Sequence, residues 1–280
     1  MTSTHVLTIA DNLGLSEAPE ACVDFVCTSP PYVTTIFERG QAFPYDSFID
    51  YLQEVFAAIY WVLKPGCSFA LNVADILTKY RYKEASGMSR ASLGCDALTA
   101  AQNVGFRLFE RFIWDKGFTR NFGGPLLGSY PYPGSLYNNT YWEYLWILKK
   151  PGQRRVPQEL RMRSSLSIDE WRAYSQKFWR VESVSEKIPF HGAVFPIEIP
   201  RRLIKMFSFV GDIVLDPFSG TGATAIAAQQ AMRRSISIDN NSACLKMMTE
   251  RISLEHLAGN GNKFVFSQSE DIKSAFSCLL

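Results

Sequence analysis

The sequence has few of the residues that build metal sites. Only three histidines occur among its 280 residues, and no two cysteines form a C-x-x-C pair. Zinc sites draw on clustered cysteine and histidine side chains, so we expect no bound metal. Cysteines scattered through apolar runs instead indicate buried thiols of a reducing compartment. The six are Cys22, Cys27, Cys67, Cys95, Cys244 and Cys278.

Long apolar runs and net charge are also lacking. No run reaches the ~18 apolar residues of a membrane helix, and no basic segment precedes an apolar stretch at the N-terminus. We therefore expect a soluble, cytoplasmic protein with no membrane partner. The net charge of +2 is too small to indicate a polyanion partner by itself. The length and the 47% apolar content fit one large α/β domain with an insertion, or two small domains.

An apolar, β-prone run over residues 23–28 stops at Ser29, two prolines and Tyr32. Because each proline ring fixes φ and removes a hydrogen-bond donor, a central strand cannot continue through Pro30 and Pro31. We expect the strand to end by Ser29, leaving a stiff loop at the sheet edge where ligands bind in open α/β folds. Such a loop can stack on a flat heteroaromatic ring while its oxygens accept hydrogen bonds from an amino group. An ordinary strand-ending proline turn is the alternative.

A second apolar run, residues 213–215, ends in Asp216 and is followed by a glycine-containing turn and a helix-forming run over 225–232. Glycines let the backbone turn tightly and let a ligand approach without a clash with Cβ. The next strand candidate, 235–239, ends in Asp239. A βαβ nucleotide site places an acid there to accept hydrogen bonds from ribose hydroxyls.

Residues 220–225 also fit the G-x-G-x-x-A fingerprint of dinucleotide-binding dehydrogenases. That interpretation leaves residues 29–32 unexplained. A phosphate-binding P-loop is excluded, because no lysine follows the glycines.

Residues 29–32 (Ser-Pro-Pro-Tyr) and 216–222 (Asp-Pro-Phe-Ser-Gly-Thr-Gly) together resemble the signature motifs of the amino-methylating DNA methyltransferases that use S-adenosylmethionine. The Ser-Pro-Pro-Tyr motif comes first, as in the circularly permuted β class of that family. The resemblance extends from about residue 5 to about residue 255. It implies an α/β fold: a Rossmann-like, circularly permuted methyltransferase domain with a mixed, mostly parallel sheet, helices on both faces and an inserted DNA-recognition region.

The same resemblance assigns roles to individual positions. The expected catalytic residues, which would hold the target base and its amino group, are Ser29, Pro30, Pro31 and Tyr32. The expected S-adenosylmethionine contacts are Asp216, Pro217, Phe218, Ser219, Gly220, Thr221, Gly222, Thr224, Asp239, Asn240, Asp11, His191 and Phe195. His191 and Phe195 belong to a segment that resembles the one covering the cofactor's methionine end. Asp11 is equally well explained as the N-cap of a helix.

Basic residues gather in one stretch, 149–180, which holds nine lysines and arginines against three acids. A basic run is usually a solvated surface, but beside the two motifs it favours a double-stranded DNA partner. The expected DNA contacts are Arg154, Arg155, Arg161, Arg163, Lys177 and Arg180. We therefore divide the chain into a catalytic part (1–148), a basic target-recognition insertion (149–190) and a cofactor-binding part (191–280).

The resemblance also bears on the substrate. Ser29 resembles the cytosine-N4 group, whereas many adenine-N6 enzymes carry aspartate at this position, so the expected product is N4-methylcytosine, with adenine-N6 as the alternative. An RNA methylase and a non-catalytic DNA-binding protein with a degenerate methylase fold remain as further alternatives. A partner restriction endonuclease, and a monomer or homodimer, are expected by analogy with the family.

The remaining sequence predicts further elements. Helical spacing of apolar residues predicts a core-facing helix capped by Asp46 or Ser47, and a second helix over 97–104. Strands are expected at 5–10, 67–73, 106–114, 141–148 and 263–267, a turn at 63–66, and loops at 33–45, 78–95 and 118–139.

Overall fold

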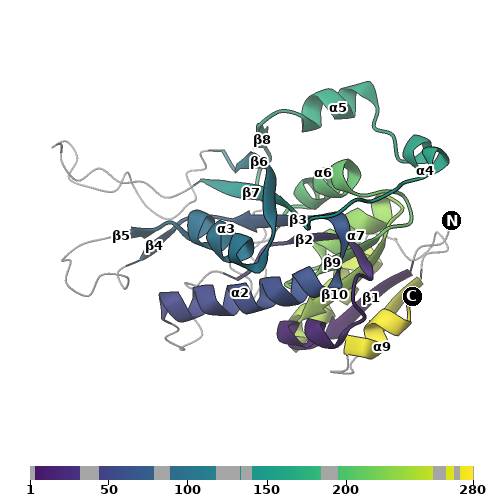
Figure 1. Cartoon of the computed structure of the whole chain (residues 1–280), viewed down its shortest axis with the longest axis horizontal. Coiled ribbons are helices and arrows are strands. Elements are labelled where there is room, and N and C mark those ends of the chain that lie inside the picture. The colour runs from purple at the N-terminus through teal and green to yellow at the C-terminus, as the bar shows by residue number, and fades with distance from the viewer. Residues whose placement is uncertain are drawn as a thin grey trace.

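A nine-stranded sheet runs through the molecule in the order β11-β1-β10-β9-β2-β3-β7-β6-β8 (Figure 1). The computed structural model describes residues 4–31, 44–78, 89–117, 133, 141–183, 195–254, 263–267 and 272–279. The strands of the sheet are β1 (Thr4–Ile9), β2 (Val23–Thr28), β3 (Leu63–Val73), β6 (Arg107–Asp115), β7 (Trp142–Lys149), β8 (Phe178–Arg180), β9 (Ile213–Asp216), β10 (Arg234–Asp239) and β11 (Lys263–Ser267). Only β7 runs antiparallel to its neighbours, so the mixed, mostly parallel sheet is confirmed.

Helices cover both faces of the sheet. One apolar cluster joins α2, α3, η1 and α9 to one face, and a second joins α6 and α7 to the other. The helices are η1 (a 3₁₀ helix, Asn12–Glu17), α2 (Tyr45–Val62), α3 (Leu93–Val104), α4 (Gln158–Arg163), α5 (Ile168–Tyr174), α6 (Glu198–Phe207), α7 (Ala223–Gln230), α8 (Ser242–Leu254) and α9 (Ile272–Ser277). The chain is therefore a three-layer α/β fold of the Rossmann-like kind.

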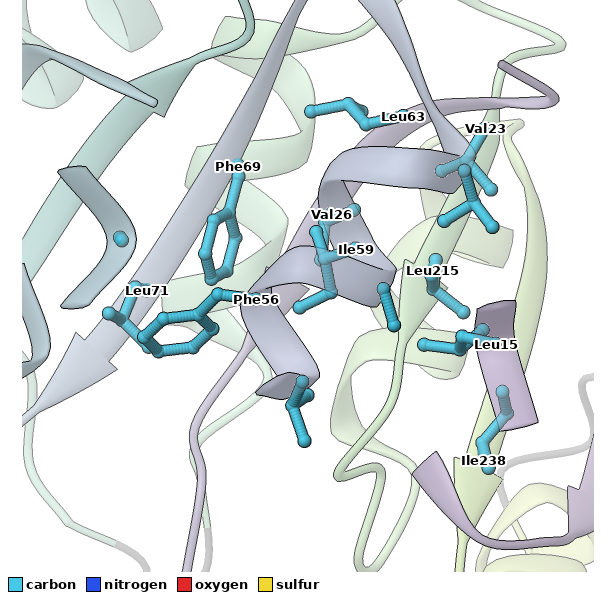
Figure 2. Close-up of a cluster of buried hydrophobic side chains, with 14 of the residues drawn as sticks. Leu15, Val23, Val26, Phe56, Ile59, Leu63, Phe69, Leu71, Leu215 and Ile238 are labelled. Atoms are coloured by element: carbon cyan, nitrogen blue, oxygen red, sulfur yellow. The ribbon is translucent and has the colours of Figure 1, made fainter. Parts of the chain in front are cut away.

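Helix α2 covers the centre of the sheet with its predicted apolar face. Phe48, Leu52 and Phe56 are fully buried, while Gln53 and Glu54 between them are exposed, as a period of 3.6 residues requires. Figure 2 shows Phe56 and other apolar side chains of this helix facing the strands. This packing holds β2 in place from one face of the sheet. The Ser-Pro-Pro-Tyr motif follows directly after β2.

Several local predictions need correction. The turn expected at 63–66 is already part of β3, which starts directly after α2 and accommodates Pro65 where its pairing with β2 shifts register. The loop expected at 78–95 contains β5 (Ser89–Ala91), which pairs with β4 (Ile76–Thr78), and the start of α3. Most of the loops expected at 33–45 and 118–139 lies outside the described residues.

The basic stretch is built into the main sheet. Its strand β8 pairs with β6 at the end of the sheet, and the buried Trp179 ring stacks on Phe112 with centroids 4.7 Å apart. Helices α4 and α5 precede β8; in Figure 1, α5 lies above α6 and α4 lies to the right of it. Residues 149–183 therefore share the sheet with both halves of the expected methyltransferase domain.

Four cysteines are buried as expected, but Cys95, in the first turn of α3, and Cys278, directly after α9, are exposed. Among the described residues no cluster of three or more metal-ligating side chains occurs. No helix in the described part of the chain is long and apolar enough to cross a membrane.

Candidate active site

Two neighbouring strands in the middle of the sheet end side by side. β2 pairs in parallel with β9, and their last residues are Thr28 and Asp216. After β2 the chain continues to α2 on one face of the sheet, and after β9 it continues to α7 on the opposite face. The order in which strands are added to the sheet therefore reverses its direction between β2 and β9. Ligands of open α/β sheets bind in the crevice at such a point. The predicted strand end is confirmed, and Ser29 and Pro30 emerge next to the turn that begins at Pro217.

The turn after β9 depends on its glycines. Gly220 and Gly222 have φ values of 46° and 81°, which side chains rarely adopt. A Cβ at Gly222 would also lie 2.3 Å from Cγ of Met248 on α8. Ser219 fixes the turn from the other side, because its backbone N–H and its hydroxyl both donate to the carbonyl of Ile238 (3.0 Å each). The start of α7 is thereby held at the carboxyl ends of β9 and β10.

Asp239 ends β10 at the same edge of the sheet. Its carboxylate accepts hydrogen bonds from the backbone N–H of Gly220 (Oδ2, 2.9 Å) and of Asn241 (Oδ1, 2.9 Å). Asp239 is half-buried, and its carboxylate links the glycine turn to β10 at the carboxyl edge of the sheet. This is the position that the sequence predicted for a ribose-binding acid.

A small polar and aromatic group lies beside Asp239. Asp11 caps η1 by accepting from the N–H of Leu13 (3.0 Å), so its N-cap role is observed. Asn12 donates from Nδ2 to the Tyr51 hydroxyl (3.3 Å), while its buried Oδ1 has no hydrogen-bond partner among the described residues. Burial raises the pKa of the Tyr51 phenol, and the negative charges of Asp11 and Asp239 raise it further. The hydrogen bond from Asn12 lowers this pKa and so opposes the rise.

Sequence analysis did not identify Asn12 or Tyr51 as part of the site. The Tyr51 ring meets the half-buried Phe218 ring edge-on, with centroids 6.4 Å apart, so an aromatic wall joins α2 to the glycine turn. The missed signal was the Asp-Asn pair directly after a strand that lies parallel to β10.

Asp216 is a buried carboxyl group at the centre of the site. Its Oδ1 accepts from the Thr28 hydroxyl (2.5 Å) and from the N–H of Phe218 (3.1 Å). Burial raises the pKa of Asp216 to about 6, the charge of Asp239 adds to the rise, and the donated hydrogen bonds oppose it. Thr224 in the first turn of α7 lies close to this carboxyl group, but its hydroxyl lacks the geometry of a hydrogen bond.

The other expected site residues are placed in different ways. Thr221 accepts a hydrogen bond from Arg251 (3.0 Å), and Asn240 is exposed after β10. Phe195 packs edge-on against Trp114 of β6 (6.0 Å), on the far side of β2 from Asp239. Pro31 is exposed, whereas Tyr32 and His191 lie outside the described residues.

A family model described as DNA methylase, for enzymes of the N6 and N4 type, matches residues 23–250, which contain both motifs. The chain belongs to this DNA methylase family. The type II methyltransferase M.MjaI of Methanocaldococcus jannaschii is 27% identical over 91% of this chain and 93% of its own length. The DNA adenine methyltransferase YhdJ of Escherichia coli is 25% identical over 86% and 79%.

One solved structure extends the comparison to three dimensions. TTHA0409 of Thermus thermophilus, described as a putative DNA modification methylase and solved with S-adenosylmethionine, superposes on this methylase with a TM-score of 0.74. The two share 30% sequence identity over 95% of this chain and 99% of the other. The Rossmann-like fold expected from the motifs is confirmed.

In this methylase Arg154 has a structural position. Its guanidinium makes two hydrogen bonds to Asp212 (2.6 and 2.9 Å) and lies 3.4 Å from Asp24, which also pairs with Lys64 (2.8 Å). Asp212 precedes β9 and Asp24 lies near the start of β2, so this cluster is at the amino edge of the sheet. The structure does not bring Arg154 to Ser29, and a DNA contact there does not fit its buried ion pairs.

The other predicted DNA contacts lie at both edges of the sheet. Arg161 and Arg163 belong to α4. The C-cap of α4, Ser164, accepts a hydrogen bond from the N–H of Val210 (2.9 Å), which lies at the amino edge of the sheet. Arg155 is exposed beside Arg154. Lys177 pairs with Glu110 of β6 (2.5 Å). Arg180 is exposed at the end of β8, which runs in the same direction as β2. Of the six, Arg180 is therefore the one at the same edge as Ser29.

Proposed function

We propose that this methylase transfers a methyl group from S-adenosylmethionine to the exocyclic N4 of cytosine in duplex DNA, at a specific sequence. The observation that carries the proposal is the pairing of β2 with β9. Because these strands end together, the Ser29-Pro30-Pro31 loop and the glycine turn border one crevice. The name of M.MjaI, a type II methyltransferase, supports a role in a restriction-modification system with a partner endonuclease.

The residues around Asp239 fit an adenosyl group. Asp239 can accept hydrogen bonds from ribose hydroxyls, since each of its two carboxylate oxygens accepts from one backbone group and can accept a further bond. The unpaired Asn12 Oδ1 offers a buried acceptor for an amino group, and the Tyr51–Phe218 wall offers aromatic surface. When bound, S-adenosylmethionine supplies an electrophilic methyl group on a sulfonium. We assign the methionine end to the segment of His191 and Phe195.

The Ser29 loop would hold the amino group that accepts the methyl. A ring amino group is a weak nucleophile because its lone pair is delocalised into the ring. The Ser29 hydroxyl and the carbonyl next to Pro30 can accept its two hydrogens and favour a pyramidal nitrogen. Tyr32 would stack on the base, which must first be flipped out of the duplex. The protein's main contribution is then the positioning of two reactants in line.

The choice of cytosine rests on Ser29. A serine hydroxyl at this position is similar to the cytosine-N4 group, whereas an aspartate is common in the adenine enzymes. Adenine-N6 is the second candidate, and the relationship to the DNA adenine methyltransferase YhdJ favours it. Both candidates use the same loop, crevice and cofactor.

DNA contacts are proposed first for Arg180, because it lies at the edge of the sheet that carries Ser29. β2 and β8 are separated by four strand spacings, or about 20 Å. That separation suits a phosphate contact on the duplex that flanks a flipped base. Lys177, Arg155, Arg161 and Arg163 are secondary candidates, since they lie further from this edge or are already paired.

The test is to identify the methylated nucleoside. Mixed-sequence duplex DNA is incubated with the protein and methyl-labelled S-adenosylmethionine, digested to nucleosides and analysed by mass. We expect label on N4-methylcytosine. Label on N6-methyladenine would overturn the base assignment and retain the mechanism. Cofactor binding without labelled DNA would point to RNA, which is assayed in parallel, and loss of both would favour a non-catalytic DNA-binding protein.

A further inference from the structure

Thr28 connects the two halves of the site through its side chain. It is the last residue of β2, it is fully buried, and its hydroxyl donates to Asp216 Oδ1 (2.5 Å) at the end of β9. Asp216 is itself buried, with 3% of its surface exposed. A buried polar group without a hydrogen-bond partner costs free energy of folding, so this pair has a well-defined geometry.

The last paired residues of the two strands come just before Thr28 and Asp216. The pairing of β2 with β9 includes only Phe25 with Val214 and Val26 with Leu215. On its other side β2 stays paired with β3 as far as Thr28. The hydrogen bond between Thr28 and Asp216 therefore extends the contact between the two strands beyond their last paired residues.

Both partners lead directly into the loops that would meet in the reaction. Thr28 precedes Ser29, and Asp216 also accepts from the N–H of Phe218 (3.1 Å), which holds the first residues of the glycine turn. A shift of one strand end relative to the other would change the separation of these loops. In reactions that depend on alignment, a displacement of about 1 Å can cost about a hundredfold in rate.

We propose that Thr28 is a positioning residue for methyl transfer: its hydrogen bond to Asp216 sets the distance between the Ser29 loop and the glycine turn. This inference rests on the proposed roles of those two segments. It does not depend on which base is methylated, and it assigns Thr28 no contact with the base or the cofactor.

Replacement of the hydroxyl separates positioning from simple packing. Thr28→Val keeps the shape of the side chain and removes the donor, and Thr28→Ser keeps the donor. We expect kcat of Thr28→Val, measured with saturating DNA and cofactor, to fall at least tenfold, and that of Thr28→Ser to stay within about threefold of the wild type. The cofactor dissociation constant, measured by calorimetry, should change much less than kcat.

A matched control is available at the opposite edge of the sheet. Ser235 is also buried, and its hydroxyl bonds to Nδ1 of His5 across two paired strands (2.8 Å). Ser235→Ala should lower the thermal unfolding midpoint, as Thr28→Val does, but leave kcat unchanged. If Thr28→Val does not fold, Thr28→Ala, which places no methyl group against the carboxylate, takes its place.

The pH profile provides a second readout. The groups that face the Asp216 carboxyl are Cys27 and Thr28 of β2, Thr224 of α7 and Asp239 of β10. Burial raises the pKa of the Cys27 thiol, so it stays neutral near pH 7. Because the hydroxyl stabilises the ionised carboxylate, its removal should raise the pKa of Asp216 further, and a loss of kcat caused by protonation of Asp216 should then begin at higher pH.

The outcomes that would overturn the inference are specific. They are a Thr28→Val kcat within twofold of the wild type, an equal loss of kcat in Ser235→Ala, no rescue by Thr28→Ser, or a change confined to cofactor affinity. Label is counted on total DNA, whichever base carries it, so failure of the cytosine proposal leaves this comparison intact.

Discussion

At the residue scale, Asp239 combines a structural and a proposed binding role. It accepts one backbone hydrogen bond from the glycine turn and one from Asn241. Removing the carboxylate by Asp239→Ala should weaken S-adenosylmethionine binding about tenfold to a hundredfold, because hydrogen bonds to a charged group are worth about 1.5–3 kcal/mol. Calorimetric titration with the cofactor measures this directly.

Asp239→Asn provides a graded comparison, since the amide keeps one acceptor oxygen and loses the charge. We expect its affinity for the cofactor to lie between those of the wild type and Asp239→Ala. Asp169→Ala, in the first turn of the exposed helix α5, should bind as the wild type does. Unchanged affinity in Asp239→Ala would remove Asp239 from the binding site.

At the element scale, Arg154 holds together the amino ends of β2 and β9, whose carboxyl ends form the crevice. Arg154→Met should lower the free energy of unfolding by about 2–4 kcal/mol, because it leaves the buried carboxylates of Asp212 and Asp24 with less compensation. The measurement is urea unfolding, with the midpoint and slope fitted together.

The neighbouring Arg155 supplies the control. Arg155→Met changes an exposed side chain and should alter the free energy of unfolding by less than about 0.5 kcal/mol. Arg154→Met, assayed well below its unfolding transition, should bind DNA with wild-type affinity. Normal stability combined with weakened DNA binding would instead support the DNA contact predicted from the basic run.

The elements differ in how far local sequence determines them. The end of β2 was predictable because Pro30 and Pro31 stop a strand whatever surrounds them. The structural role of Arg154 was not predictable, because Asp212, the side chain that neutralises its charge, lies 58 residues further along the chain. The hairpin of β4 and β5 was missed for a similar reason: strands of three residues carry too little periodicity to be told from a loop.

At the scale of the whole molecule, the direction of the strands divides the basic residues between two edges of the sheet. Arg180 ends β8 on the side of Ser29, and Arg161 lies on α4, whose end is anchored at the amino edge. A duplex that delivers a flipped base to the Ser29 loop must lie along the first of these edges. The phosphate contacts of the two arginines should therefore differ.

Salt dependence distinguishes the two positions. Each phosphate contact contributes about 0.9 to the slope of log K against log salt concentration, so Arg180→Ala should lower that slope by about one. The loss of affinity should be similar for all DNA sequences, because a phosphate contact carries no base information. Arg161→Ala should leave the slope unchanged. The opposite result, with a lower slope only in Arg161→Ala, would place the duplex across α4 and would mean that the base reaches the crevice from the other side of the molecule.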